Sequence, residues 1–128
     1  MSRRKGYLAV VLDDASVTKL IARSFHNHVY CHHVTMVYKP TPKQWQKYDH
    51  LLGTKVDFVA IGIAEDRRGQ AALVKGVLSE NVHPHVTIGC SPSTEPVYSN
   101  ELLERAKRHK RIKRCRIKLS GTVQFIRL

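Results

Sequence analysis

The sequence is poor in acidic residues and cysteine, and it lacks any long apolar run. Its three cysteines, Cys31, Cys90 and Cys115, are odd in number and have no metal-type or redox-type spacing. We therefore expect reduced thiols in an intracellular, cytoplasmic protein. No stretch approaches the roughly 20 apolar residues that cross a bilayer. The basic start of the chain precedes too short an apolar stretch for a signal peptide, so we expect neither a membrane span nor a leader.

The shortage of acid leaves a large positive charge. Only 10 residues are Asp or Glu against 22 Lys or Arg, a formal net charge of +12 over 128 residues. Such a balance favours polyanionic partners, first nucleic acid and second anionic membranes. The hydrophobic fraction of 42% excludes disorder as the main state. The length predicts one domain, residues 1–128, which buries its own core as a monomer with no obligate protein partner.

The order of apolar and polar segments predicts an α+β fold with a largely antiparallel sheet. Strands are expected where apolar residues dominate short runs, and the two central runs should form a hairpin around a polar turn at 65–70. Helices are expected after capping residues, with Asp14, Thr41 and Asn100 as the caps. The expected strands are 7–12, 33–38, 56–64, 71–78, 82–90 and 115–128, the last as one strand or as two broken at Gly121, and the helices are 15–25, 42–52 and 100–111.

One tripeptide occurs twice, each time inside a strand pattern. His33-Val34-Thr35 and His85-Val86-Thr87 are 52 residues apart. Because side chains at i and i+2 of a strand share a face, each His and its Thr should point the same way, with the valine toward the core. The plain alternative is two half-exposed strands that carry His and Thr without a joint role.

Two facing imidazoles suit general acid–base chemistry. An unperturbed histidine titrates near neutral pH, so a neutral ring can accept a proton from water while a protonated ring supplies one to a leaving oxygen. A threonine hydroxyl two residues along can donate to a phosphoryl oxygen. Two such pairs would enclose a phosphodiester without a metal or any other cofactor.

These motifs, His33-Val34-Thr35-Met36 and His85-Val86-Thr87-Ile88, resemble those of the 2H phosphoesterase superfamily, which includes the LigT-like RNA 2′,3′-cyclic phosphodiesterases. The resemblance implies a bilobal fold, with two antiparallel sheet-plus-helix lobes around a central cleft. It implies metal-independent hydrolysis of 2′,3′-cyclic phosphates at RNA ends or on nucleotides. His33 and His85 would then be catalytic, with His85 as base and His33 as acid, and Thr35 and Thr87 would bind the phosphate. The close spacing of the motifs indicates a minimal member.

Other residues are candidates for substrate contacts. Tyr38, Trp45 and Tyr98 lie in or near turns that follow the motifs and could stack on a base. Arg67 and Arg68 occupy the expected hairpin tip and could contact phosphate. Each has a simpler explanation, packing for the aromatic rings and a solvated turn for the arginines.

Basic residues concentrate from Arg105 to Lys118, where nine of fourteen positions are Lys or Arg. A solvated helix face and a polyanion-binding surface both explain this density. The candidate RNA-binding surface comprises Lys107, Arg108, Lys110, Arg111, Lys113 and Arg114.

Two other functions remain open on the sequence. The same site could act on 2′-5′ oligoadenylates or cyclic oligonucleotide signals, or the chain could be a non-catalytic RNA-binding module. The spare histidines, among them His83 two residues before His85, could suggest a metal site. No carboxylate-rich or CxxC context accompanies them, so we expect no metal, and we expect His83 to have a structural or surface role.

Overall fold

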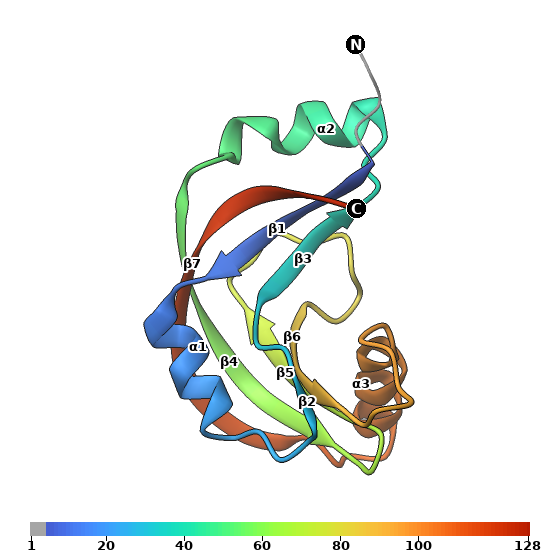
Figure 1. The fold of residues 1–128 in the computed structure, drawn as a ribbon. Coiled ribbons are helices and arrows are strands. Elements are labelled where there is room, and N and C mark those ends of the chain that lie inside the picture. The colour runs from blue at the N-terminus through green and yellow to red at the C-terminus, as the bar shows by residue number, and fades with distance from the viewer. Residues whose placement is uncertain (1–4) are drawn as a thin grey trace.

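Antiparallel strand pairing organises residues 5–128, the part of the chain that this computed structural model describes (Figure 1). These residues form seven strands, three α-helices and one short 3-10 turn. In chain order they are β1 (Gly6–Leu12), α1 (Asp14–Ile21), β2 (His28–Val29), β3 (His33–Tyr38), α2 (Pro42–Tyr48), η1 (Asp49–Leu51), β4 (Lys55–Glu65), β5 (Gly69–Lys75), β6 (His85–Cys90), α3 (Tyr98–Arg108) and β7 (Lys113–Arg127).

The strands run in the order β2-β6-β3-β1-β7-β4-β5, and β5 also pairs with β6. That last pairing closes six strands into a barrel, with the two-residue β2 added along the end of β6. The α+β class and the antiparallel sheet are therefore confirmed. Two separate lobes, which the resemblance implies, are not confirmed, because every strand belongs to one continuous sheet.

The inside of the barrel is the main hydrophobic core. Val34 and Met36 from β3 and Val86 and Ile88 from β6 are buried there, whereas the residues on either side of each valine are only half-buried. Leu20 of α1 and Tyr48 of α2 also belong to this core. A second, smaller cluster forms where Tyr98, Leu102, Leu103 and Ala106 of α3 pack on Ala64 and Ala71 of the β4–β5 hairpin.

Local chemistry explains where the helices begin. Thr41 caps α2 and exchanges hydrogen bonds with Gln44, with Pro42 in the first turn, as the sequence predicts. The cap of α1 is Asp13 rather than Asp14, since the Asp13 carboxylate accepts from the backbone N–H of Ser16. The helix also ends earlier than expected, at Ile21, where Leu20 has made its core contact.

The last helix and strand differ more from expectation. Helix α3 begins at Tyr98 without a side-chain cap and ends at Arg108, so the Asn100 cap is wrong. Strand β6 begins only at His85, after Pro84. Strand β7 is continuous through Gly121, where a Cβ atom would lie only 2.3 Å from the carbonyl oxygen of Val11 on β1. Gly121 thus allows β1 and β7 to approach closely.

Candidate active site on the outer face of β3 and β6

The two His-Val-Thr segments lie on neighbouring strands. Val34 of β3 is directly paired with Val86 of the antiparallel strand β6. This register places His33 beside Thr87 and Thr35 beside His85, all four on the face opposite the barrel core. The structure therefore brings together the four residues that the sequence singles out, and each is half-buried.

Apolar residues flank this group of four on both sides. On β1, Ala9 pairs with Thr35 and Val11 with His33. On β5, Ala71 pairs with Thr87 and Leu73 with His85. The polar group therefore sits between two apolar borders that keep water from its edges.

This environment favours neutral imidazoles. Burial, followed by the nearby His32 and His85, lowers the pKa of His33 to about 4. Burial also lowers the pKa of His85, against the opposing effect of its hydrogen bond to the His83 carbonyl. Both rings are thus uncharged at neutral pH until an anion arrives.

Hydrogen bonds at Nδ1 fix the ring of His85. Its Nδ1 lies 2.7 Å from the carbonyl oxygen of His83, and because a carbonyl only accepts, Nδ1 must carry the hydrogen. In the neutral ring Nε2 is then the unprotonated nitrogen, as a base requires. The Nδ1 of His33 lies 3.0 Å from Nδ1 of His32, so one of these two nitrogens carries the shared hydrogen.

A second hydrogen bond holds His83 itself. Its Nε2 is 2.6 Å from a carboxylate oxygen of Glu104 on α3, and only 8% of His83 is exposed. The structural role expected for His83 fits this position, because the residue ties the start of β6 to α3. The same contact steadies the carbonyl that orients His85.

Three side chains at the site are absent from the sequence-based set. The ring of Tyr7 on β1 lies 5.1 Å from the ring of His33, and Ser99 of α3 is 2.8 Å from the Thr87 hydroxyl. His32 completes the set through its bond to His33. Only His32 carries a signal in the sequence, its place next to the motif, since the other two approach through tertiary packing.

The aromatic candidates occupy different environments. Tyr38 is 57% exposed and its ring stacks on Tyr7 at 6.1 Å, which links it to His33 through Tyr7. Tyr98 is only 5% exposed, with its hydroxyl 2.5 Å from Asp66, so a stacking role for it is wrong on burial grounds. Trp45 packs edge-on against Phe125 beside the core, which fits the packing role rather than stacking on a base.

The two arginines at the hairpin tip also occupy different environments. Arg68 lies over the ring of Tyr98, 4.2 Å from its centroid, and is thereby engaged in packing. Arg67 is exposed in the turn between β4 and β5. The structure therefore leaves Arg67 as the better placed of the two for a phosphate contact.

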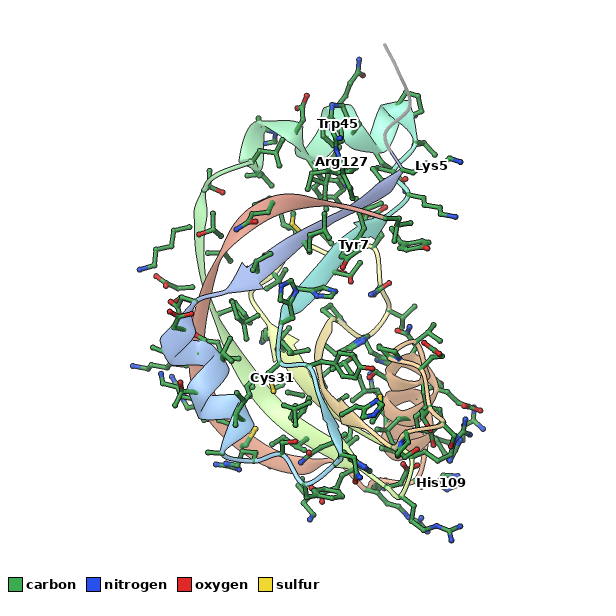
Figure 2. All side chains as sticks on the ribbon, in the orientation of Figure 1. Lys5, Tyr7, Cys31, Trp45, His109 and Arg127 are labelled. Carbon is green, nitrogen blue, oxygen red and sulfur yellow. The ribbon has the colours of Figure 1, made fainter. Side chains whose placement is uncertain are left out.

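The basic residues from Arg105 to Lys118 do not form one surface. Lys107 and Arg108 lie on α3, Lys110 and Arg111 follow it, and Lys113 and Arg114 begin β7. Ion pairs engage Arg108 with Glu104 at 3.9 Å and Lys113 with Glu65 at 3.5 Å. Figure 2 shows His109 at the end of α3, well away from Tyr7.

Within residues 5–128 no group of three or more His, Cys, Asp or Glu side chains is arranged to hold a metal ion. Within the same residues, no helix has the length and apolar character that crossing a membrane requires.

Comparisons with known proteins inform the fold alone. No protein-family model matches the sequence. No curated protein matches it either. Among solved structures, the chain is similar to a fungal RNA kinase, with a TM-score of 0.62 and 17% sequence identity over 99% of this chain. The match spans 45% of the kinase chain, so this protein corresponds to less than half of that enzyme.

Proposed function

We propose that the protein hydrolyses 2′,3′-cyclic phosphodiesters at RNA ends or on nucleotides, without a metal. The observation that carries this proposal is the Val34–Val86 pairing, which sets two histidines and two threonines on one half-buried face. The fold shared with an RNA kinase is compatible with an RNA substrate. The resemblance of both motifs to 2H phosphoesterases supplies the reaction class.

The reaction divides between the two rings. A water molecule attacks phosphorus while Nε2 of His85 takes its proton, and a new P–O bond forms. His33, protonated when the anionic substrate is bound, gives its proton to the departing ribose oxygen as that P–O bond breaks. The product is a phosphomonoester with a free neighbouring hydroxyl, and each imidazole ends in the other's starting protonation state.

The threonines serve the phosphoryl oxygens. Their hydroxyls flank the histidines on both strands and can donate to the two non-bridging oxygens. Ser99 can donate its own hydrogen to Thr87 Oγ1, and the Thr87 hydroxyl would then exchange its long 3.4 Å bond to the Pro96 carbonyl for one to the phosphate. Hydroxyl donors and one imidazolium would thus stabilise the negative charge of the transition state.

Nucleoside 2′,3′-cyclic phosphates in excess chelator test the proposal directly. We expect turnover by the wild type and a loss of about 10²–10⁴-fold in kcat for both His33→Ala and His85→Ala. His109→Ala, at an exposed position beyond α3, is the matched control and should retain full turnover. Turnover that requires a divalent metal, or that survives either substitution at the site, would contradict the proposal.

Substrate comparison separates the remaining alternatives. Hydrolysis of 2′-5′ oligoadenylates in preference to 2′,3′-cyclic nucleotides would keep the site and change its substrate. Salt-sensitive RNA binding without cleavage of any phosphodiester would identify a binding module instead.

A further inference from the structure

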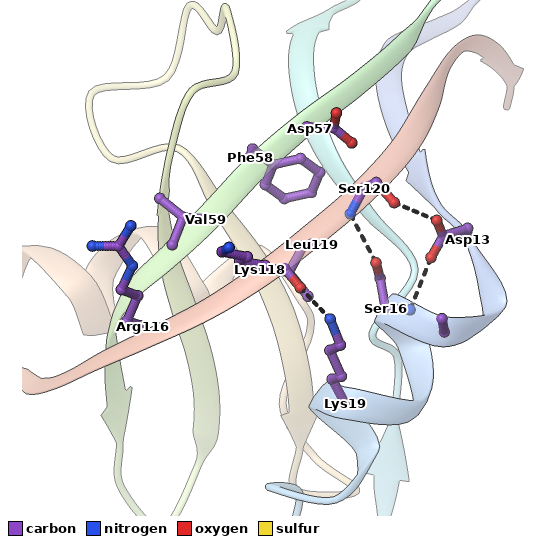
Figure 3. A pocket seen from close by; sticks show the side chains of 11 residues that line it. Asp13, Ser16, Lys19, Asp57, Phe58, Val59, Arg116, Lys118, Leu119 and Ser120 are labelled. Atoms are coloured by element: carbon purple, nitrogen blue, oxygen red, sulfur yellow. Dashed lines mark hydrogen bonds between the residues drawn. The ribbon is translucent and has the colours of Figure 1, made fainter.

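A groove on the other side of the barrel carries cations that the active-site proposal does not use. It has a volume of about 450 Å³ and lies between α1 and the outer face of β4 and β7 (Figure 3). Its apolar floor is formed by the partly exposed Val59 and by the edges of the core residues Phe58 and Leu119, and its basic residues are Lys19, Arg116 and Lys118.

The register of β4 and β7 makes the two ends of this groove differ in charge. Val59 pairs with Lys118, and Asp57 pairs with Ser120 one step further along. Asp13 also lies at the Ser120 end, where it accepts hydrogen bonds from Ser16 and Ser120. Acidic groups therefore gather at one end and cations at the other.

The basic end continues as a regular row along β7. Arg114, Arg116 and Lys118 are exposed at alternate positions, while Cys115 and Ile117 between them face inward. Alternate residues of a strand are about 7 Å apart, close to the repeat of consecutive phosphates along an extended nucleic-acid strand. The row thus presents one cation per phosphate step.

The three cations of this row have no acidic partner within the described residues. No carboxylate of residues 5–128 forms an ion pair with Arg114, Arg116 or Lys118. By contrast, Arg105 and Arg108 are paired with acids on their own helix. Within the same residues Lys107, Lys110 and Arg111 form no ion pair either, so Arg114, Arg116 and Lys118 are distinguished by their regular spacing on one face of β7.

Helix α1 closes the groove from above. Lys19 donates from Nζ to the Lys118 carbonyl at 2.7 Å, and the Ser16 hydroxyl accepts from the Ser120 N–H at 2.8 Å. These bonds hold α1 against β7, so the groove walls are built into the fold.

We propose that this groove binds the sugar–phosphate backbone of single-stranded RNA, with the row of Arg114, Arg116 and Lys118 on the phosphates. A single strand is favoured over a duplex because unpaired bases can contact the apolar floor, whereas a duplex keeps its bases inside. This proposal rests on the proposed function, which supplies the RNA substrate. It adds a second RNA-binding surface, remote from the phosphodiester that is cleaved.

Paired charge reversals test it. The test variant is Arg116→Glu with Lys118→Glu, and the matched control is Lys107→Glu with Lys110→Glu, which makes the same charge change at α3. Binding of a fluorescent single-stranded RNA that ends in a 3′-phosphate, which is not a substrate, is measured by anisotropy across a salt series. Thermal melts verify folding, and Arg116→Gln with Lys118→Gln replaces the test variant if it unfolds.

We expect the test variant to weaken binding at least about tenfold and to flatten the salt slope by about 1.4, the value for two lost single-strand phosphate contacts. The control should change affinity less than about threefold. Equal losses in both variants, equal binding of duplex RNA, or equal competition by polyglutamate would overturn the proposal.

The RNA-binding measurement tests the groove independently of the proposed catalytic activity. Arg116 and Lys118 lie outside the proposed active site, so the groove variant should hydrolyse a cyclic mononucleotide as fast as the wild type. If the wild type hydrolyses no cyclic phosphodiester but the groove variant still binds RNA more weakly than the wild type, only the phosphodiesterase proposal is contradicted. If the wild type hydrolyses cyclic mononucleotides but the groove variant binds RNA as tightly as the wild type, only the proposed RNA-binding groove is contradicted.

Discussion

Val34 of β3 pairs directly with Val86 of β6, and this single pair sets both His-Val-Thr segments on one face. Each valine is fully buried, so the neighbouring His and Thr must face away from the core. A slip of one residue on either strand would turn its histidine inward, because side chains alternate between faces. Core packing therefore fixes the geometry of the site.

The first prediction concerns the two hydroxyls. Thr35→Val and Thr87→Val keep the side-chain shape and remove one donor each, so we expect kcat/KM to fall about 10–100-fold. Steady-state kinetics on a cyclic mononucleotide measure the loss.

The two variants should differ in stability. Thr87→Val leaves the buried Ser99 hydroxyl without its partner, which costs about 1–3 kcal/mol, whereas the hydroxyl of Thr35 has no such dependent group. Urea unfolding separates these effects. Wild-type kinetics in both variants would exclude threonine donors from the mechanism.

The second prediction is an acidic optimum. Burial, followed by His32 and His85, lowers the pKa of His33 to about 4, and burial lowers the pKa of His85 below its usual 6.5. The reaction needs one protonated ring and one neutral ring, so activity falls once pH exceeds the higher of the two values. We expect kcat/KM, which reports the free protein, to peak below pH 6.5 and to decline about tenfold per pH unit above the peak.

A variant checks the cause of the low pKa. His32→Gln removes a charge that opposes protonation of His33, so the acidic limb of the profile should move to higher pH. A peak at or above pH 7 in the wild type would show that the rings titrate differently from this account.

The third prediction concerns Glu104 as a positioning residue. Its carboxylate holds His83, whose carbonyl orients His85. Glu104→Ala should lower kcat about tenfold with little change in KM, since misorientation of a base affects the chemical step. Glu101→Ala, one turn earlier on α3 and also ion-paired, is the control and should retain wild-type kinetics. Equal kinetics in both variants would argue against a role for Glu104 in orienting His85 through His83.

The fourth prediction tests the assignment of Tyr98 to packing. Its buried hydroxyl donates to Asp66, so Tyr98→Phe should lower the free energy of unfolding by about 1–2 kcal/mol. Tyr38→Phe removes the same atom from an exposed ring and should leave stability unchanged. Urea denaturation compares the two, and a larger loss at Tyr38 would contradict the assignment.

Several elements could be predicted because their cause is local. The strand at 33–38 has its observed limits, and the β4–β5 hairpin forms around its polar turn. The α2 cap is likewise local, since Thr41 and Gln44 are three residues apart. The end of α1 could not be predicted, and the sequence left open whether β7 is one strand or two, because contacts with distant strands decide both.

The candidate site divides in the same way. The repeated tripeptide indicates which residues share a face, since alternation within a strand is a property of the backbone. Which two strands become neighbours depends on barrel closure, and so do the approach of Tyr7 to His33 and of Ser99 to Thr87. The catalytic activity of this arrangement stays a prediction.

The sequence by itself determined the α+β class, the strand that each motif occupies and the excess of positive charge. Those properties depend on composition and on residues close together in the chain. Only the tertiary structure decided that one closed barrel replaces two separate lobes, that Tyr98 is buried, and that Arg116 and Lys118 of β7 line a groove beside α1. Pairings between residues far apart in the chain control these outcomes, and short-range patterns do not encode them.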